Sequence, residues 1–424
     1  MEQNITKELP YGIQDFVQVI EQGFYYVDKT MFIPNLEDSH NNLFCIRPRR
    51  FGKSVLLSML HAYYDCRTKD KFQEWFGDLW IGKHPTATQG RYQVLYLDFS
   101  QMEGTIENLE ENFNEGCCAA MDDFMDKYGE YYPEATKKQF YDCDDAGIKL
   151  IIMTLQARSL RYPLYLIVDE YDSFINAMLN NEQGEKMSRA IEQADRLFCD
   201  FFKKVKGAFE RTLFTGVTPV VLDGVVTGNN VAWNIAGYDK CYQMLGFSTE
   251  DIRGILTYYK SKGKISAGTD IESVIHDMEL WCGNYCLSMD ALESQRRVFN
   301  CDMAIDYLCH YIENGEVSKQ MLTSKYEEDF CNVKRLLRQD GADGYRKDVL
   351  RTIRERGEID VLIKNVFSPQ DITNPDMFAS FLLYYGLLTI EGTKGCRLTL
   401  GIPNDSVRKM YNETFAEYCN NEKM

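Results

Sequence analysis

The fold of this 424-residue chain is decided by the stretch Phe44-Cys45-Ile46-Arg47-Pro48-Arg49-Arg50-Phe51-Gly52-Lys53-Ser54. Its apolar beginning predicts a strand at about 43–47, and the apolar run after it predicts a helix from Lys53 to about Tyr64. In the pattern G-x-x-x-x-G-K-[ST], backbone N–H groups surround phosphates, the lysine reaches the β and γ oxygens, and the hydroxyl ligates Mg²⁺. The stretch therefore indicates a phosphate-binding loop.

This loop departs from the pattern at its first position, where Arg47 replaces glycine. Pro48 biases Arg47 toward an extended backbone rather than the usual turn. The tripeptide Gly52-Lys53-Ser54 also occurs as an ordinary helix start, so a second element is needed to support the interpretation.

The second element is the apolar run Leu164-Tyr165-Leu166-Ile167-Val168, which ends in Asp169-Glu170-Tyr171-Asp172. Such a run suits a strand buried on both faces of a parallel sheet, where ligands lie at the carboxyl ends of the strands. We expect Asp169 to hold Mg²⁺ or its water, and Glu170 to orient the water that attacks a γ-phosphate. The alternative is that both acids only cap the next helix.

Four segments together resemble one known family, namely Arg47–Ser54 (RPRRFGKS), Leu9–Phe16, Tyr25–Thr30 and Phe214–Thr218. They are similar to the AAA-ATPase-like family of bacteria, whose members are often fused to a C-terminal PD-(D/E)XK nuclease. The likeness spans roughly residues 8 to 250. In that family an arginine-rich loop replaces the first glycine, and the resemblance implies binding of ATP with Mg²⁺.

The resemblance also implies roles for individual residues. Thr215, at the end of a short strand at 212–216, matches the polar γ-phosphate sensor of AAA-like ATPases, although a purely structural threonine is the alternative. The arginine finger is open between Arg49, Arg50, Arg211 and a neighbouring subunit. Tyr11, Gly12, Ile13 and Phe16 fall where the adenine is covered. The loop contacts with the nucleotide are expected from Arg47, Pro48, Arg49, Arg50, Phe51, Gly52, Lys53, Ser54 and Val55.

Two departures from the family stand out. Its W-Y-x-G-Y stretch appears here in drifted form as Trp281-Cys282-Gly283-Asn284-Tyr285-Cys286. The nuclease, which needs two acids and a lysine around a metal, is expected to be missing because the chain stops at Met424. The segment from Glu358 to Lys364 offers acids and a lysine, but we interpret it as a solvated edge strand or helix end.

Composition limits the class of protein. The net charge of −17 disfavours a surface that grips nucleic acid, because lysine and arginine supply most of that affinity. The chain has no apolar run of bilayer-spanning length and no signal peptide, so we expect a cytoplasmic protein without a membrane partner. Its 14 cysteines are scattered, which favours reduced thiols over a disulfide scaffold or a zinc site.

The order of the elements predicts an α/β fold of the P-loop NTPase type (AAA/ASCE-like). Strands are expected at about 43–47, 94–99, 164–169, 212–216 and 242–245, forming a parallel sheet with helices on both faces. We expect this domain to cover residues 1–261. Residues 262–424 should form a helical, winged-helix-like region that contacts protein partners or the chain itself rather than DNA.

The prediction is therefore an ATP-binding protein and Mg²⁺-dependent ATPase that acts as a nucleotide-driven switch. Lys53 and Ser54 hold phosphates and Mg²⁺, Asp169 holds Mg²⁺, Glu170 is the base and Thr215 the sensor. The alternatives are a non-hydrolysing nucleotide-binding scaffold and a remnant of a nuclease-linked defence protein.

Overall fold

The computed structural model describes residues 6–100, 107–173, 185–205, 207–219, 233–317, 334, 337, 344–364, 371 and 374–421. The N-terminal half of the chain forms a parallel sheet of five strands in the order β2-β3-β4-β1-β5. The strands are β1 (Asn42–Ile46), β2 (Gln93–Asp98), β3 (Leu164–Asp169), β4 (Arg211–Gly216) and β5 (Trp233–Asn234). The strand that carries Thr215 therefore lies between the loop strand and the acidic strand.

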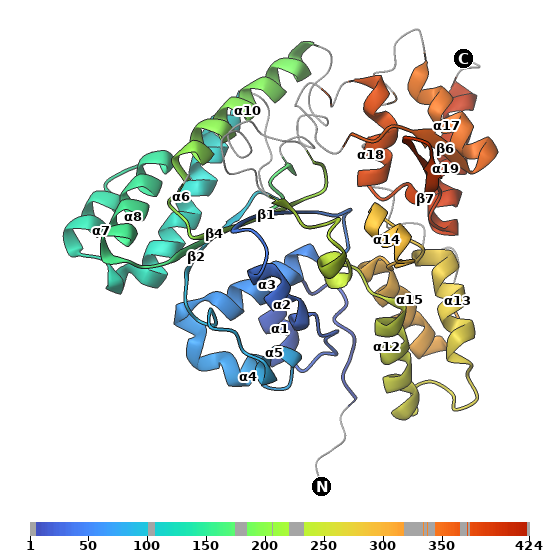
Figure 1. Cartoon of the computed structure of the whole chain (residues 1–424), viewed down its shortest axis with the longest axis horizontal. Coiled ribbons are helices and arrows are strands. Elements are labelled where there is room, and N and C mark those ends of the chain that lie inside the picture. Colours follow the sequence, from blue (N-terminus) through green and yellow to red (C-terminus); the bar gives the residue numbers. More distant parts are fainter. Residues whose placement is uncertain are drawn as a thin grey trace.

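Helices cover both faces of this sheet, and the predicted α/β architecture is confirmed. Figure 1 shows the first group on one side of the sheet and the second group on the other. The first group is α1 (Phe16–Glu21), η1 (Thr30–Phe32), α2 (Ile33–Glu37), α3 (Lys53–Tyr64), η2 (Cys66–Lys71), α4 (Phe72–Phe76) and α5 (Trp80–Lys83). The second group is α6 (Leu109–Tyr128), η3 (Gly129–Tyr131), α7 (Glu134–Tyr141), α8 (Ala146–Leu160) and α10 (Glu185–Val205).

The central strands and α3 form where the sequence predicts them, because their apolar patterns match their burial. Every residue of β3 is buried, as expected for a strand covered on both faces. Helix α3 has the predicted bounds and packs Leu57, Leu60 and Tyr64 into the core. The site residues at the ends of β1, β3 and β4 are thus held by rigid elements.

The fifth strand was predicted at the wrong place. Residues 242–245 do not form a strand, because the segment Asp239–Met244 is the 3-10 helix η4, and β5 lies earlier in the chain. Cys241, Tyr242 and Met244 are all buried. A short apolar run of this kind has the same composition in a buried turn as in a buried strand, so the pattern could not distinguish them.

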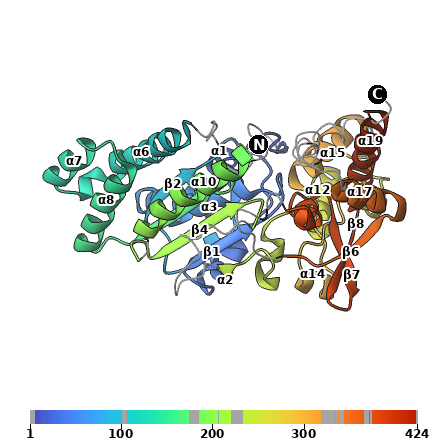
Figure 2. The ribbon, with the colours of Figure 1, turned by 90° about the horizontal axis from the view of Figure 1, so that it is seen from above.

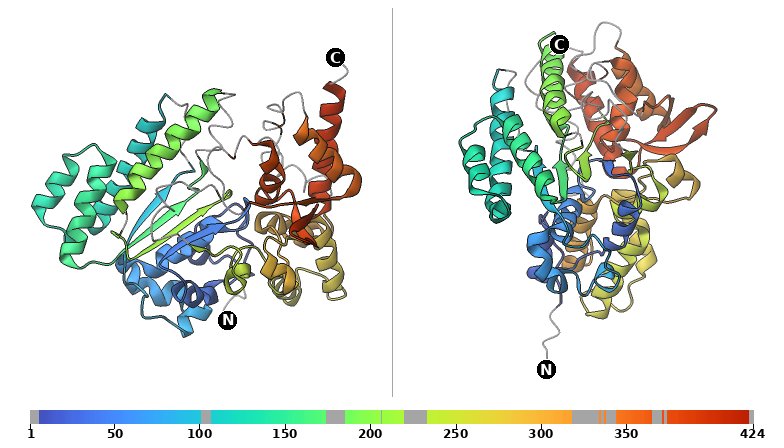
Figure 3. Two further views of the ribbon diagram at one scale, coloured as in Figure 1. Left: turned by 45° about the horizontal axis from the view of Figure 1, so that its top comes forward. Right: turned by 60° about the vertical axis from the view of Figure 1, so that its left-hand side comes forward.

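The C-terminal region combines helices with a small antiparallel sheet of order β6-β8-β7. Figure 2 shows it at the opposite end of the molecule from α7 and α8, and Figure 3 shows the β7–β8 hairpin projecting from the body. Strand β6 is an edge strand, which confirms that interpretation of the segment from Glu358. The helices and strands that follow η4 in the chain are α12 (Thr249–Ser261), α13 (Ile271–Cys282), α14 (Met289–Glu293), α15 (Cys301–Asn314), α17 (Tyr345–Arg356), β6 (Glu358–Val361), η7 (Pro375–Met377), α18 (Phe378–Tyr384), β7 (Thr389–Lys394), β8 (Arg397–Gly401) and α19 (Asp405–Asn421).

Some predicted segments lie outside the described residues. They are the segment 223–230, whose glycines and asparagines indicate a loop, and, apart from Lys334 and Leu337, the segment 324–338, whose pattern indicates a helix. Among the helices that are described, none is both long and apolar enough to cross a membrane.

Candidate nucleotide site

The phosphate loop joins β1 to α3 and turns sharply at two positions. Arg50 has a φ of 69° and Gly52 a φ of 86°, both in the left-handed region that glycine adopts most readily. Gly52 is also the N-cap of α3, and no side chain caps that helix end. In the described part of the chain, no acceptor takes the backbone N–H groups of Phe51, Gly52, Lys53 or Ser54. A helix N-terminus with four such donors is suited to an anion.

Lys53 is buried beneath the loop, with 6% of its surface exposed. Its Nζ donates to the carbonyl oxygens of Arg47 at 3.1 Å and Pro48 at 3.0 Å. Burial lowers the pKa of the Lys53 ammonium, and the carboxylates of Asp169 and Glu170 oppose that shift. The ammonium thus lies within the electrostatic reach of both acids of the second motif.

The Asp169 carboxylate accepts hydrogen bonds from side chains of α3, β2 and β4. Its Oδ2 accepts from Ser54 Oγ at 2.8 Å and, more weakly, from the Tyr96 hydroxyl at 3.4 Å. Its Oδ1 accepts from Thr215 Oγ1 at 2.5 Å and from the N–H of Glu170 at 2.9 Å. Asp169 is only 3% exposed, so these donors satisfy a charge that would be costly to bury alone. The structure therefore brings together Ser54, Asp169 and Thr215.

Glu170 follows in a left-handed conformation with a φ of 49°. Burial raises the pKa of its carboxyl above the ordinary value, while the charge of Lys53 opposes the shift. A non-glycine residue with such a φ persists only where its surroundings hold it, and such residues gather at functional sites. Two residues further on, Asp172 accepts from the N–H of Thr218 at 2.6 Å and so joins the ends of β3 and β4.

Two arginines lie elsewhere than the sequence suggested. The Arg47 side chain is 2% exposed and turns away from the loop, with Nη2 donating to the Tyr242 carbonyl at 2.9 Å and its guanidinium 4.5 Å from the Tyr242 ring centre. Its side chain is therefore not a phosphate contact. Arg211 begins β4, at the opposite end of the sheet from the site, and donates to the carbonyls of Leu36 and Glu37. Arg211 is thus excluded as an arginine finger acting within the same chain, because it lies a full strand away.

Arg49 and Arg50 remain near the site. The positive charge of Arg49 lowers the pKa of Glu170, against the stronger effect of burial. Arg50 Nε lies 4.0 Å from Asp302 Oδ2 at the start of α15.

An apolar cavity opens beside the start of α3, with about 720 Å³ of empty space that includes open solvent. Ile13 lines it, and its contact with a nucleotide base stays a prediction. Tyr11 does not line this cavity, and its side chain is 52% exposed. Phe16 is fully buried and packs on Phe76 and Tyr26 instead. The lining residues nearest the loop in sequence or space include Leu9, Pro10, Phe51, Gly52, Val55, Gly246, Phe247 and Cys301.

The chemistry of the donors fits a magnesium ion shared with a nucleotide. Mg²⁺ prefers oxygen ligands and is usually bound through one or two carboxylates together with phosphates and waters. Ser54 and Asp169 supply one hydroxyl and one carboxylate side by side. Among the described residues no group of three or more histidine, cysteine or acidic side chains could hold a metal by itself. The site therefore suits a metal that arrives with phosphates.

Sequence reasoning missed several residues that shape the site. Tyr96 and Asp172 were within or next to recognised strands, but nothing in their spacing distinguished them from core residues. Asn300, Asp302 and Gly246 contact the loop from positions about 200 to 250 residues later in the chain. A single sequence carries no signal for such distant contacts.

The chain is similar in sequence and in fold to known proteins. The family described as "Predicted AAA-ATPase" matches residues 10–226. A curated relative, the "Uncharacterized protein in vnfD 5'region" of Azotobacter chroococcum mcd 1, is 25% identical over 258 residues, which is 59% of this chain and 45% of that protein. This chain thus spans less than half the length of that relative. The solved ORC2 protein of Aeropyrum pernix, in ADPNP–ADP complexes, aligns over 99% of this chain and 98% of its own, with 11% identity and a TM-score of 0.30.

Proposed function

Because the chain belongs to the predicted AAA-ATPase family, we propose that it binds ATP with Mg²⁺ at this loop and hydrolyses it. The observation that carries the proposal is the 2.8 Å hydrogen bond between Ser54 and Asp169, which lie 115 positions apart in the sequence. The two residues belong to the two motifs that the chemistry requires. Their hydrogen bond joins two side chains and is not part of the backbone bonding of a helix or a strand. The acidic strand therefore meets the phosphate loop at the place where a metal-bound triphosphate needs both.

Each residue has a part in that reaction. The free N–H groups from Phe51 to Ser54 bind phosphate oxygens, and the Lys53 ammonium moves from the loop carbonyls onto them. Mg²⁺, held by Ser54 and Asp169 when bound, would neutralise charge on the phosphates. Glu170 orients the attacking water and takes its proton, and burial, which raises the pKa of its carboxyl, makes the carboxylate a stronger base. The cavity beside Gly52 takes the base, with Ile13 as one wall.

Thr215 is assigned a positioning role in this proposal. Its hydroxyl donates to Asp169 and thereby fixes the direction of that carboxylate. The direct contact with a γ-phosphate, expected from the resemblance, stays a prediction.

Release of phosphate from ATP and Mg²⁺ tests the proposal. Wild-type protein should turn ATP over, Glu170→Gln should stop turnover and still bind ATP, and Lys53→Ala should weaken binding. Glu210→Gln is the matched control, since Glu210 pairs with Arg91 beyond the opposite end of β4 and should leave turnover unchanged. If wild type and Glu170→Gln both bind ATP but neither releases phosphate, the chain is a non-hydrolysing scaffold. Metal-dependent DNA cleavage that survives Lys53→Ala would contradict the view that this chain lacks nuclease activity.

We further propose that the nucleotide state acts on the C-terminal region as a switch. The helix α18 followed by the β7–β8 hairpin supports a winged-helix-like module, which in an acidic protein favours protein contacts over DNA. The boundary after residue 261 and a cytoplasmic location stay predictions from the sequence.

A further inference from the structure

Five consecutive carbonyls of the phosphate loop are hydrogen-bonded, the first two by Lys53 of the loop itself and the other three by groups outside the loop. Lys53 takes the carbonyls of Arg47 and Pro48. The next three are taken by residues that follow the sheet in the chain: Asn300 Nδ2 donates to Arg49 O at 3.4 Å, Asp302 N to Arg50 O at 3.3 Å, and Gly246 N to Phe51 O at 3.0 Å. With its carbonyls turned outward, the loop presents its N–H groups to a phosphate. The loop's shape therefore depends on residues 246 and 300–302.

Arg47 holds the beginning of the loop in the same way. Its buried guanidinium lies against the Tyr242 ring and donates to the Tyr242 carbonyl. The ring is itself fixed at its other end, since the Tyr242 hydroxyl donates to Tyr285 O at 3.1 Å and accepts from Leu287 N at 3.1 Å. Tyr242 thus links the loop to the segment 284–288.

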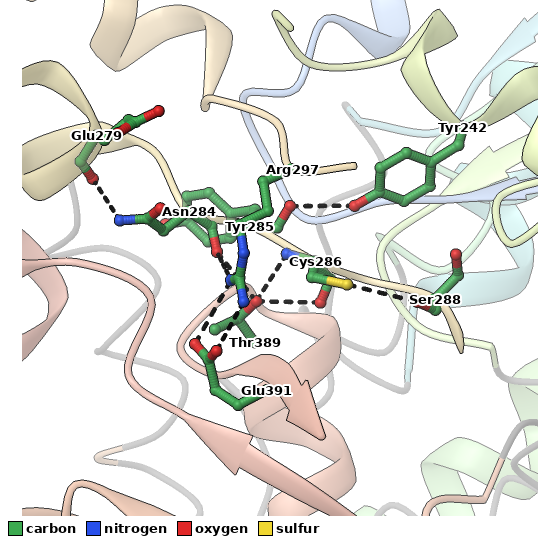
Figure 4. Close-up of polar contacts among 9 residues, drawn as sticks. All are labelled: Tyr242, Glu279, Asn284, Tyr285, Cys286, Ser288, Arg297, Thr389 and Glu391. Atoms are coloured by element: carbon green, nitrogen blue, oxygen red, sulfur yellow. Dashed lines mark hydrogen bonds and ion pairs between the residues drawn. The ribbon is translucent and has the colours of Figure 1, made fainter. Parts of the chain in front are cut away.

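That segment is bound to the C-terminal sheet, as Figure 4 shows. The Thr389 hydroxyl, at the start of β7, accepts from Cys286 N at 2.7 Å and lies 3.0 Å from Cys286 O and 3.2 Å from Asn284 O. Arg297 donates to Asn284 O at 2.8 Å and pairs with Glu391 Oε2 at 2.7 Å. A continuous chain of contacts runs from β7 through segment 284–288 and Tyr242 to Arg47.

We infer that Arg47 and Tyr242 are positioning residues for the phosphate loop, and that segment 284–288 couples the loop to the sheet β6-β8-β7. The inference rests on the proposed function for its effect on ATP. It gives the drifted stretch Trp281–Cys286 a role, which is to connect the nucleotide site with the C-terminal sheet. Coupling of this kind is reciprocal, so ATP that favours one loop shape also favours one arrangement of the sheet.

The polar groups in this chain of contacts are buried. Thr389 and Tyr242 are fully buried, and Arg47 nearly so. A buried donor or acceptor that loses its partner costs more than the bond contributed, so the chain of contacts moves as a unit or breaks at a defined place. Because the contacts are continuous, we expect that removing a hydrogen bond at β7 changes the position of Arg47 and of the phosphate loop.

The substitution Thr389→Val tests the coupling far from the nucleotide. It keeps the shape of the side chain and removes the hydroxyl that holds segment 284–286. We expect ATP with Mg²⁺ to bind about five- to fiftyfold more weakly in titration calorimetry. The matched control is Thr399→Val in the neighbouring strand β8, which loses a 2.7 Å bond to Asp360 but touches nothing in the segment. It should bind ATP within about twofold of wild type.

Two further variants support the test. Arg297→Lys keeps the charge but cannot reach both Asn284 and Glu391, and it replaces Thr389→Val if that variant does not fold. Tyr242→Phe keeps the ring against Arg47 and removes only the link to segment 284–288. Combined with Thr389→Val, it should weaken binding by less than the product of the two single effects, because both break the same chain.

Unchanged ATP affinity in Thr389→Val, equal losses in Thr389→Val and Thr399→Val, or fully independent effects of Tyr242→Phe and Thr389→Val would each overturn the inference. If wild-type protein binds no ATP, the proposed function fails, and hydrogen exchange in the nucleotide-free protein then decides the coupling. Thr389→Val should speed exchange in the peptide covering residues 44–60, whereas Thr399→Val should not. Equal exchange in the two variants would contradict the inference whatever the ligand.

Discussion

The bond between Thr215 and Asp169 allows a matched pair of substitutions on one strand. Thr215→Val keeps the buried shape but removes the donor at 2.5 Å from Asp169 Oδ1. Thr212→Val, at the beginning of the same strand, removes a 3.0 Å bond to Asn42 Oδ1 and lies away from the site. Both side chains are buried, at 0% and 7% exposure, so packing losses should be alike.

The magnitude follows from the partner. A hydrogen bond to a charged group contributes about 1.5–3 kcal/mol, whereas a neutral one contributes about 0.5–1.5 kcal/mol. Asp169 keeps Ser54 and the Glu170 N–H as donors, so no orphaned charge adds to the loss. If the bond orients the Asp169 carboxylate for the reaction, its loss raises the activation free energy by the whole of this amount. That corresponds to roughly a 10- to 150-fold fall in kcat.

The assay is steady-state phosphate release together with urea unfolding for both variants. Thr215→Val should lower kcat with little change in KM, and Thr212→Val should keep kcat within about twofold of wild type while losing some stability. A Thr215→Val protein with normal kcat but reduced unfolding free energy would show that this bond is structural only. An equal fall of kcat in both variants would show that any disturbance of β4 lowers kcat, without a specific role for the bond between Thr215 and Asp169.

Three other predictions use the same protein. Lys53→Ala should weaken binding of ATP with Mg²⁺ by at least about tenfold in calorimetry, because the Lys53 ammonium lies under the loop that binds the phosphates. Unchanged affinity would contradict its assignment. Burial raises the pKa of Glu170, so the basic form should be lost as pH falls through a value above the ordinary one, and the acid limb of the kcat–pH profile should lie above pH 4.5; a limb at or below that value would contradict the role. Burial alone would raise the pKa of Asp65, but His61 and Lys127 outweigh it and lower the pKa from 3.8 to about 2. The resulting stability, about 2 kcal/mol, should be complete above about pH 4 and lost as pH falls toward 2, and urea unfolding of Asp65→Asn should show it missing at pH 7 and the two proteins converging in acid.

Elements whose burial pattern is local were predictable from the sequence. Helix α3 and strand β3 appear at the predicted residues, because a helix start after Gly52 and an all-apolar strand before Asp169 are both encoded within a few positions. The meeting of Ser54 with Asp169 followed from a rule of parallel sheets, which places the ends of neighbouring strands at one edge. No distant contact had to be known.

Predictions failed where a side chain's direction depends on distant parts of the chain. Arg47 was expected on phosphates because it belongs to the basic cluster of the loop, yet its side chain lies against Tyr242, almost 200 positions later. Residues 242–245 were predicted as a strand, but the segment Asp239–Met244 is a 3-10 helix whose Tyr242 packs against Arg47 of the loop. Tyr11 was placed beside the adenine by the resemblance, yet it does not line the cavity beside the loop and its side chain is exposed.

The missing first glycine is connected with these errors. A phosphate loop needs its N–H groups turned inward, which requires its carbonyls to find partners elsewhere. In this chain Arg47 takes no left-handed turn, and the turns fall on Arg50 and Gly52 instead. The carbonyls of Arg49, Arg50 and Phe51 are then bonded by Asn300, Asp302 and Gly246, all of which lie beyond the family-matched residues 10–226. The matched segment therefore carries the residues proposed to react with ATP, whereas the groups that shape its loop come from the part of the chain after it. We expect substitutions that remove these later groups to weaken ATP binding as substitutions in the loop itself do.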